Sequence, residues 1–249
     1  MDCHTCTFNL IKMKNFTAFA VLCALLTGFI SCTKVIGKGP IVTETRVTRE
    51  FSEVDFGVPG EMVFEESDNP EIIIEAQQNI IDVIETYVSG DDLKIRVRDG
   101  KNIRSSEEIH ITVRGKNVRS LAISGSGRLT VTEDFDPIDA RLRVSGSGKI
   151  RMRNIISESL EVRISGSGSI EADNGTVDTE DIAISGSGDV YLQDVIAKRA
   201  KTQTSGSGNI RLHAEDELEV RISGSGDVYY DGNPVIDVKV SGSGKLVRL

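Results

Sequence analysis

Hydrophobic and polar residues alternate through most of the second half of the chain. Leu142 and Val144 flank Arg143 just before a Ser-Gly-Ser-Gly tetrapeptide, and Ile150 follows Lys149 just after it. A period of two is typical of a β-strand that buries one face. The pattern therefore predicts a strand, a tight corner and a second strand.

The tetrapeptide recurs seven times at a nearly constant spacing. Successive first serines are separated by 21, 20, 20, 20, 18 and 18 residues. A period of about twenty residues is typical of a solenoid, in which each repeat forms one coil of a stack. We therefore expect an all-β fold, a right-handed parallel β-helix with coils of about twenty residues. The rest of each period, such as residues 153–161, is expected to form a return loop.

Glycine is expected at the corners for a geometric reason. Corner residues of adjacent coils lie about 4.8 Å apart, and glycine allows positive φ without adding a Cβ to that column. Fourteen of the 24 glycines lie in the seven tetrapeptides. The first glycine of each is the predicted structural corner: Gly125, Gly146, Gly166, Gly186, Gly206, Gly224 and Gly242.

Residues 47–118 lack the tetrapeptide but contain shorter alternating stretches, which predict irregular first coils. Apolar residues between Gln78 and Val88 recur at helical spacing, so we expect a short helix there that covers the open end of the stack. Residues 119–249 are predicted to form the regular β-helix. Residues 47–249 are expected to be one structural domain.

The N-terminal residues are typical of a bacterial lipoprotein signal. Lys14 precedes an uncharged, largely apolar stretch, Phe16–Ile30, which is too short to span a membrane comfortably. The stretch leads to Cys32, the expected lipidation site. This predicts a signal peptide over residues 1–31 and a tether over residues 32–46. Met13 is the better translation start, and Met1 is the alternative.

Composition narrows the classes of partner. The net charge of −9 disfavours nucleic acid as a partner. All four cysteines lie at or before Cys32, so neither a disulfide nor a thiolate metal site is expected after it. We predict no cofactor and no metal. The sequence leaves one alternative, a single calcium site near Asp178, Glu180 and Asp181.

The repeat also carries a family resemblance. A lipoprotein signal, a strand-rich lead-in and repeated apolar-Ser-Gly-Ser-Gly-x-apolar units together resemble the auto-transporter adhesin head domain, or GIN domain, of Gram-negative envelope proteins. The resemblance covers residues 50–249. It implies an envelope protein with an adhesin-like role, and it brings no catalytic residues with it.

One repeat position suggests a binding surface. The residue two places before the tetrapeptide is basic in four coils, and tyrosines occur in the strands that follow two of the tetrapeptides. The candidate ligand-facing strip is Arg143, Arg163, Arg221, Lys239, Tyr191 and Tyr229. The alternative is a solvated face whose cations pair with neighbouring acids.

These observations predict a non-enzymatic envelope scaffold or adhesin-like binding module for a glycan or a protein partner. We expect it to be lipid-anchored to the outer membrane and to face the periplasm or the surface. The alternative is a carbohydrate-active β-helix enzyme, but no stacked carboxylate pair follows the corners. The apolar residues of the last coil suggest a homo-oligomer through the C-terminal end.

Overall fold

The computed structural model describes residues 33–104 and 107–249, and one compact unit covers Lys34–Leu249. The predicted signal segment and Cys32 lie outside the described residues. The N-terminal elements are β1 (Thr33–Ile36), β2 (Ile41–Val47), β3 (Glu53–Gly57), β4 (Glu61–Glu66), β5 (Glu71–Gln77), α2 (Gln78–Ile81), β6 (Ile84–Ser89), β7 (Asp92–Val97), β8 (Lys101–Arg104) and β9 (His110–Gly115).

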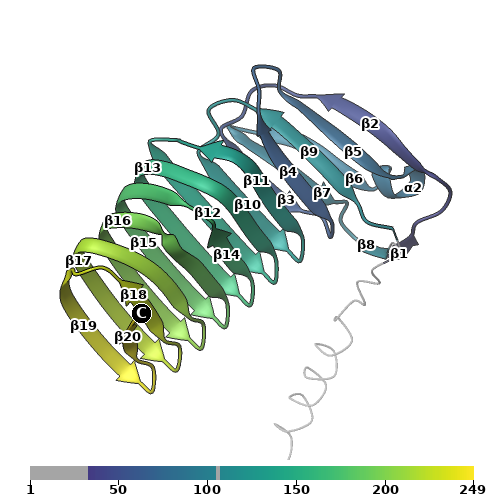
Figure 1. Cartoon of the computed structure of the whole chain (residues 1–249). Helices are drawn as coiled ribbons and strands as arrows, with labels where there is room; N and C mark the ends of the chain where they lie inside the picture. Colours follow the sequence, from purple (N-terminus) through teal and green to yellow (C-terminus); the bar gives the residue numbers. More distant parts are fainter. Residues whose placement is uncertain (1–32, 105–106) are drawn as a thin grey trace, which may run out of the picture. The chain divides into compact units, whose positions relative to one another are not determined.

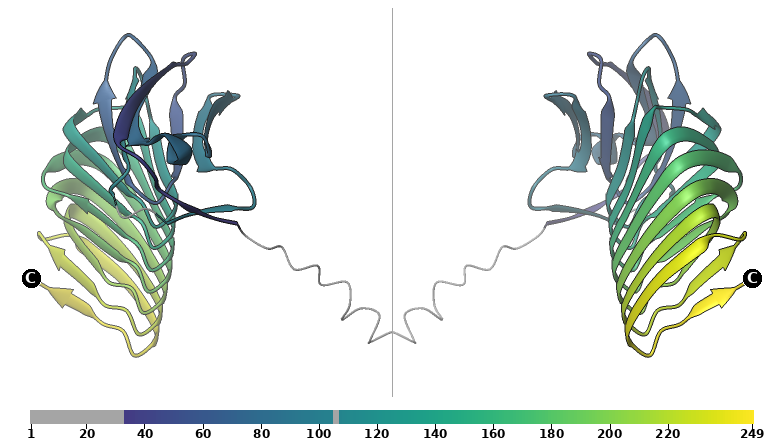
Figure 2. Two further views of the ribbon diagram at one scale, coloured as in Figure 1. Left: turned by 90° about the vertical axis from the view of Figure 1, so that its right-hand side faces the viewer. Right: turned by 90° about the vertical axis from the view of Figure 1, so that its left-hand side faces the viewer.

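The repeat region contributes eleven further strands. They are β10 (Ser120–Gly125), β11 (Arg128–Phe135), β12 (Asp139–Gly146), β13 (Lys149–Gly166), β14 (Ser169–Ala172), β15 (Gly175–Gly186), β16 (Asp189–Gly206), β17 (Ile210–Gly224), β18 (Val228–Asp231), β19 (Val235–Gly242) and β20 (Leu246–Arg248). The coils stack in parallel, and their tight corners line up along one edge (Figures 1 and 2). The predicted β-solenoid is confirmed.

Two sheets enclose the core. The first sheet holds the segments that lead into the corners, in the order β7, β3, β10, β12, β13, β15, β16, β17 and β19. The second holds the segments that leave them, in the order β9, β4, β11, β13, β14, β16, β17, β18 and β20. Like residues stack on like, as Ser145 pairs with Ser165 and Gly146 with Gly166. Inward side chains therefore form apolar columns between the sheets.

Most of the return segments are strands, so the prediction of return loops, made for residues 153–161, is wrong. Residues 153–161 lie inside β13, and Ile155 pairs with Gly175 of β15 while Leu160 pairs with Glu180. A stacked coil offers a backbone partner on both sides, which favours extended chain over a loop because almost every N–H and C=O is satisfied.

The N-terminal coils do not stack in sequence order. Strand β3 lies between β7 and β10, and β4 lies between β9 and β11. The chain thus builds one coil, adds a second outside it, and returns to the inner side of the first to begin the repeats. The corner of the β3–β4 coil is Gly57-Val58-Pro59-Gly60, which takes the register place of the tetrapeptide.

The helix is much shorter than predicted. Only Gln78–Ile81 is helical, and the residues expected to continue it form β6, which pairs antiparallel with β7. Thr86, Tyr87 and Val88 favour a strand, and the outer edge of β7 needs a backbone partner. The stack is therefore closed by antiparallel strands, β6 on β7 and β5 on β9, while α2 buries Ile80 and Ile81.

The glycine corners have the expected backbone. The seven predicted corner glycines have φ between +115° and +137°. A Cβ on Gly186 would overlap the carbonyl oxygen of Gly166 in the coil below, and the same contact recurs along the column. Among the described residues, no helix is long and apolar enough to cross a membrane.

Candidate binding groove

An open groove of about 670 Å³ runs along the outer face of the first sheet, from β7 to β16. Small side chains form its floor, because Ala122 and Ala183 hold outward positions and the first serines of five tetrapeptides line one side. Its charged lining residues are Glu53, Asp55, Asp92, Lys94, Arg143 and Arg163. These are three acids and three bases, so the groove carries no net charge.

The predicted basic strip forms a column on this sheet. Register places Arg143 beside Arg163, and Arg221 beside Lys239. Ala183 and Gln203 separate the two pairs. Arg143 and Arg163 therefore line the groove, while Arg221 and Lys239 lie beyond its end.

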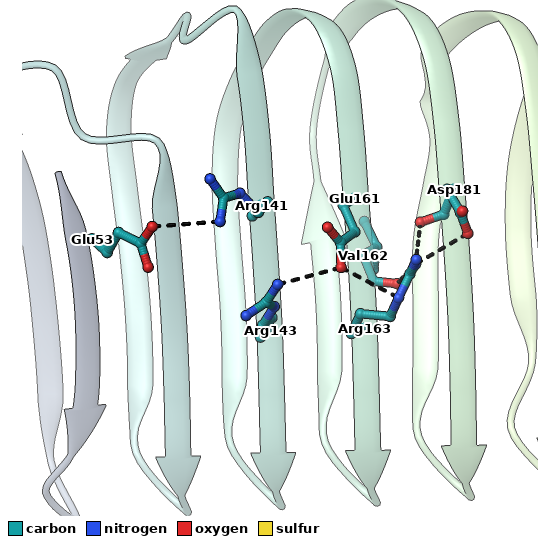
Figure 3. Close-up of polar contacts among 7 residues, drawn as sticks. All are labelled: Glu53, Arg141, Arg143, Glu161, Val162, Arg163 and Asp181. Carbon is teal, nitrogen blue, oxygen red and sulfur yellow. Dashed lines mark hydrogen bonds and ion pairs between the residues drawn. The ribbon is translucent and has the colours of Figure 1, made fainter. Parts of the chain in front are cut away.

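Acidic neighbours compensate the arginines of this column (Figure 3). Arg143 Nη2 lies 3.4 Å from Glu161 Oε1, and Arg163 lies 3.4 Å from the same oxygen and 3.1 Å from Asp181. Arg221 lies 3.0 Å from Glu219 and 3.2 Å from Asp237. These pairs match the alternative interpretation of a solvated, paired face, and they lower the attraction of the groove for anions.

The two tyrosines lie on the other sheet. Tyr191 and Tyr229 belong to the outward column of the second sheet, where Arg211 stands between them. The Arg211 guanidinium carbon is 5.8 Å from the Tyr191 ring centre and 5.3 Å from that of Tyr229. Because the outer faces of the two sheets point in opposite directions, the tyrosines and the arginines do not form one surface.

A polar network closes the β7 end of the groove. The Ser124 hydroxyl donates to Asp55 Oδ1 over 2.7 Å, and Lys94 Nζ lies 3.0 Å from Asp55 and 2.6 Å from Asp92. Burial lowers the pKa of Lys94, but hydrogen bonds to Asp92 and Asp55 and their charges more than offset it, so the pKa is raised. Lys94 therefore stays charged.

This network fixes side chains rather than activating them. A nucleophilic serine needs a base able to take its proton, and Lys94 neutralises Asp55, the carboxylate to which Ser124 donates. No histidine lines the groove in the part of the chain that the structure describes. Sequence reasoning missed the network because β3 and β7 carry no tetrapeptide to reveal their register with β10.

One carboxyl group lies in the core. Glu180 is 2% exposed, and neither of its oxygens has a hydrogen-bond partner among the described residues. Burial raises its pKa to about 8. The hydroxyls of Thr202 and Thr204 are also buried without partners. Glu180 therefore points away from any calcium site near Asp178, whose carboxylate pairs with Lys198 over 2.6 Å.

Three residues outside the groove could approach a metal together. Glu61 and Glu108 lie 3.6 Å and 3.9 Å from different nitrogens of His110. The group is largely exposed, and Arg128 also faces Glu61 at 3.8 Å. These contacts among largely exposed side chains do not by themselves indicate a metal site.

Comparisons with known proteins agree with this architecture. The chain matches the family described as "Putative auto-transporter adhesin, head GIN domain" over residues 50–234, and it belongs to that family. No curated protein matches it significantly.

Several solved structures share the fold. A putative adhesin from Bacteroides fragilis NCTC 9343 has a TM-score of 0.82 at 19% identity, covering 86% of this chain and 100% of that one. A "putative lipid binding protein" from Parabacteroides distasonis ATCC 8503 has a TM-score of 0.68 at 24% identity, covering 87% and 100%. A putative adhesin from Parabacteroides merdae ATCC 43184 has a TM-score of 0.69 at 20% identity, covering 87% and 99%.

Proposed function

We propose that this protein is a non-enzymatic, adhesin-like binding module of the cell envelope, and that its groove binds an extended glycan along the stack. The observation that carries the proposal is the groove itself, which crosses seven strands of the first sheet. Seven strands span about 29 Å at the usual strand spacing. A site of this length fits a polymer better than a compact small molecule.

The lining of the groove supports a neutral or zwitterionic sugar chain. The hydroxyls of four tetrapeptide serines, Ser145, Ser165, Ser185 and Ser205, can donate and accept hydrogen bonds, as sugar hydroxyls do. Planar guanidinium groups, such as that of Arg143, offer further donors. The acids that pair with the arginines work against a purely anionic ligand.

Filling the groove tests the proposal. Ala183→Trp puts a large side chain on the groove floor at an outward position, whereas Thr130→Trp does the same on the second sheet. The full chain, purified in detergent, is assayed against immobilised neutral and acidic oligosaccharides. We expect Ala183→Trp to weaken glycan binding at least tenfold and Thr130→Trp to leave it unchanged.

The same assay separates the alternatives. Release of reducing sugar from the bound oligosaccharides would support a carbohydrate-active enzyme instead. Equal loss in both variants would remove the groove as the site. Binding to immobilised peptides in place of the oligosaccharides, blocked by Ala183→Trp, would replace the glycan with a protein partner.

We also propose that a lipid on Cys32 anchors the protein to the outer membrane. The support is the signal-like sequence that ends at this cysteine. Cys32→Ala should abolish labelling by a fatty-acid analogue, because thioether attachment needs the sulfur. Equal labelling of the variant and the parent would rule the anchor out.

A further inference from the structure

The last coil exposes apolar side chains that the preceding coil buries. Ile236, Val238 and Val240 of β19 point inward and are 38%, 44% and 46% exposed. Their register partners in β17 are at most 2% exposed: Leu218, Val220 and Ile222. The row is therefore core surface that no other described residue covers. Strand β19 is the last of its sheet, at one end of the stack (Figure 1).

The backbone at this end is also unpaired. Among the described residues, β19 pairs only with β17 and β20 only with β18. At the other end of the stack, antiparallel strands cover the same kind of edge, with β6 on β7 and β5 on β9. An open edge beside an apolar row is typical of a surface that accepts another strand.

We propose that a second copy of this chain covers the end, with the two β19 strands paired antiparallel about a two-fold axis at Val238. In this register Val238 faces its own copy, and Ile236 faces Val240 of the second copy. On the outer face, Asp237 lies opposite Lys239 of the second copy. The two-fold axis makes the Ile236–Val240 and Asp237–Lys239 contacts twice and the central Val238 contact once, as in a self-complementary interface.

The charges select this register. The two β19 strands could also pair in other registers. Because side chains alternate with a period of two, a register that keeps the apolar side chains of both strands inward places the two-fold axis at a residue rather than between residues. An axis at Asp237 would oppose two aspartates, and an axis at Lys239 would oppose two lysines, both of which are unfavourable. Only the axis at Val238 pairs opposite charges at both positions.

Lys239 gives independent support. The other four cations of its column, Lys94, Arg143, Arg163 and Arg221, each pair with an acid of the same chain. Lys239 makes no ion pair within residues 33–104 and 107–249, although it belongs to the same column. In the proposed dimer it gains Asp237 of the second copy as a partner.

A charge swap tests the interface. The full chain in detergent is studied by sedimentation with the detergent density-matched, up to about 100 µM, a range that detects dimers with micromolar affinity. Asp237→Lys and Lys239→Asp each create two like-charge contacts, so each should weaken the dimer about tenfold. The double variant, with both changes, should restore it.

Val238→Lys is the second probe, because it places two cations at the axis and should leave a monomer. Val238 is 44% exposed, so the fold should survive, and circular dichroism checks this. A monomeric parent protein at every concentration overturns the proposal. A dimer that Val238→Lys leaves intact also overturns it, and so does a double variant as weak as the single ones.

Discussion

The N-terminal coils and the repeat coils share one stack but are held together in different ways. The N-terminal half buries Phe51, Phe56 and Phe64 and closes its edge with antiparallel strands. In the described chain after Phe135, no aromatic side chain is fully buried, and the core consists mainly of aliphatic columns. Each N-terminal contact occurs once, whereas each repeat contact is copied in the next coil.

This difference decides what each half tolerates. A repeat coil must present the same backbone path as its neighbours, so the corner glycines are fixed by geometry rather than by packing. An N-terminal coil can use other residues at its corner, as Val58 and Pro59 show, because its shape is set by unique side-chain contacts. Substitutions that break the repeated geometry of one half, or the unique packing of the other, should therefore separate the two halves.

The largest expected effect concerns Glu180, which breaks the aliphatic pattern of the repeat core. Its column neighbours are Leu160 and Ala200, so no cation compensates it there. Below pH 4.5 the carboxyl is protonated in both the folded and the unfolded chain. Above pH 4.5 only the unfolded chain ionises, until the folded pKa of about 8 is reached. The free energy of unfolding should fall by roughly 3–6 kcal/mol across this range.

Urea unfolding at several pH values measures this fall. Glu180→Gln keeps the shape of the side chain but cannot ionise, so its stability should vary much less between pH 4.5 and pH 8. Glu180→Leu should be more stable than the parent protein at pH 8 and above. Parallel pH profiles for the parent and Glu180→Gln would show that another group is responsible.

The second prediction exchanges the corner residues of the two halves. Gly186→Val should cost about 2–4 kcal/mol, because φ is +124° there and the new Cβ meets the Gly166 carbonyl. In the N-terminal coil, Val58 holds the matching place and is 1% exposed. Val58→Gly should also destabilise, by about 1.5–3 kcal/mol, through lost burial.

Ser169→Val is the matched control for the repeat region, since Ser169 lies on the outer face just after a corner. Its free energy of unfolding, measured in urea, should change by less than about 0.5 kcal/mol. Asp189 in the same column is unsuitable, because it accepts hydrogen bonds from Asn209 over 2.9 Å and 3.1 Å. If Val58→Gly stabilises the protein, the two corners follow one rule and the contrast fails.

The repeats were predictable from the sequence because each coil reports the register of the next. The order of the N-terminal coils was not, since nothing in residues 47–118 shows that β3 lies between β7 and β10. The helix over residues 78–88 was overextended for a related reason. Apolar spacing at Ile84 and Val88 fits a helix face, but the unpaired edge of β7 makes a strand more favourable there.

The candidate site shows the same division. The column of Arg143 and Arg163 followed from the repeat position alone. Their shared acidic partner, Glu161, lies two residues before Arg163 on the same outer face. The sequence-based prediction placed Tyr191 in the same strip. Tyr191 lies in a segment that leaves a corner, whereas Arg143 and Arg163 lie in segments that enter one, so Tyr191 belongs to the other sheet. The groove also depends on Asp55 and Lys94. The pairing of β3 with β7 brings these two residues together, and the sequence does not show that pairing.

The third prediction concerns the cap, where Arg46 of β2 joins three elements. Its Nη1 donates to Ile84 O over 2.8 Å and to Thr86 Oγ1 over 3.2 Å, and its Nη2 donates to Ile81 O over 3.4 Å. Arg46→Ala should cost about 1–3 kcal/mol, because the carbonyls of Ile81 at the end of α2 and of Ile84 at the start of β6 lose this donor. Hydrogen exchange should rise first in residues 80–89. Uniform acceleration across the repeats would mean that the cap does not act locally.

The smallest effect is expected at Arg143, on the outer face of the repeats. Its side chain is 47% exposed and its pair with Glu161 is 3.4 Å long, a kind of contact that contributes little in water. Glu161 also keeps Arg163 as a partner at 3.4 Å when Arg143 is removed. Arg143→Gln should therefore change the free energy of unfolding, measured in urea, by less than about 0.5 kcal/mol. A loss near that of Arg46→Ala would show that this column stabilises the stack, whereas unchanged stability with weaker glycan binding would assign Arg143 to the ligand.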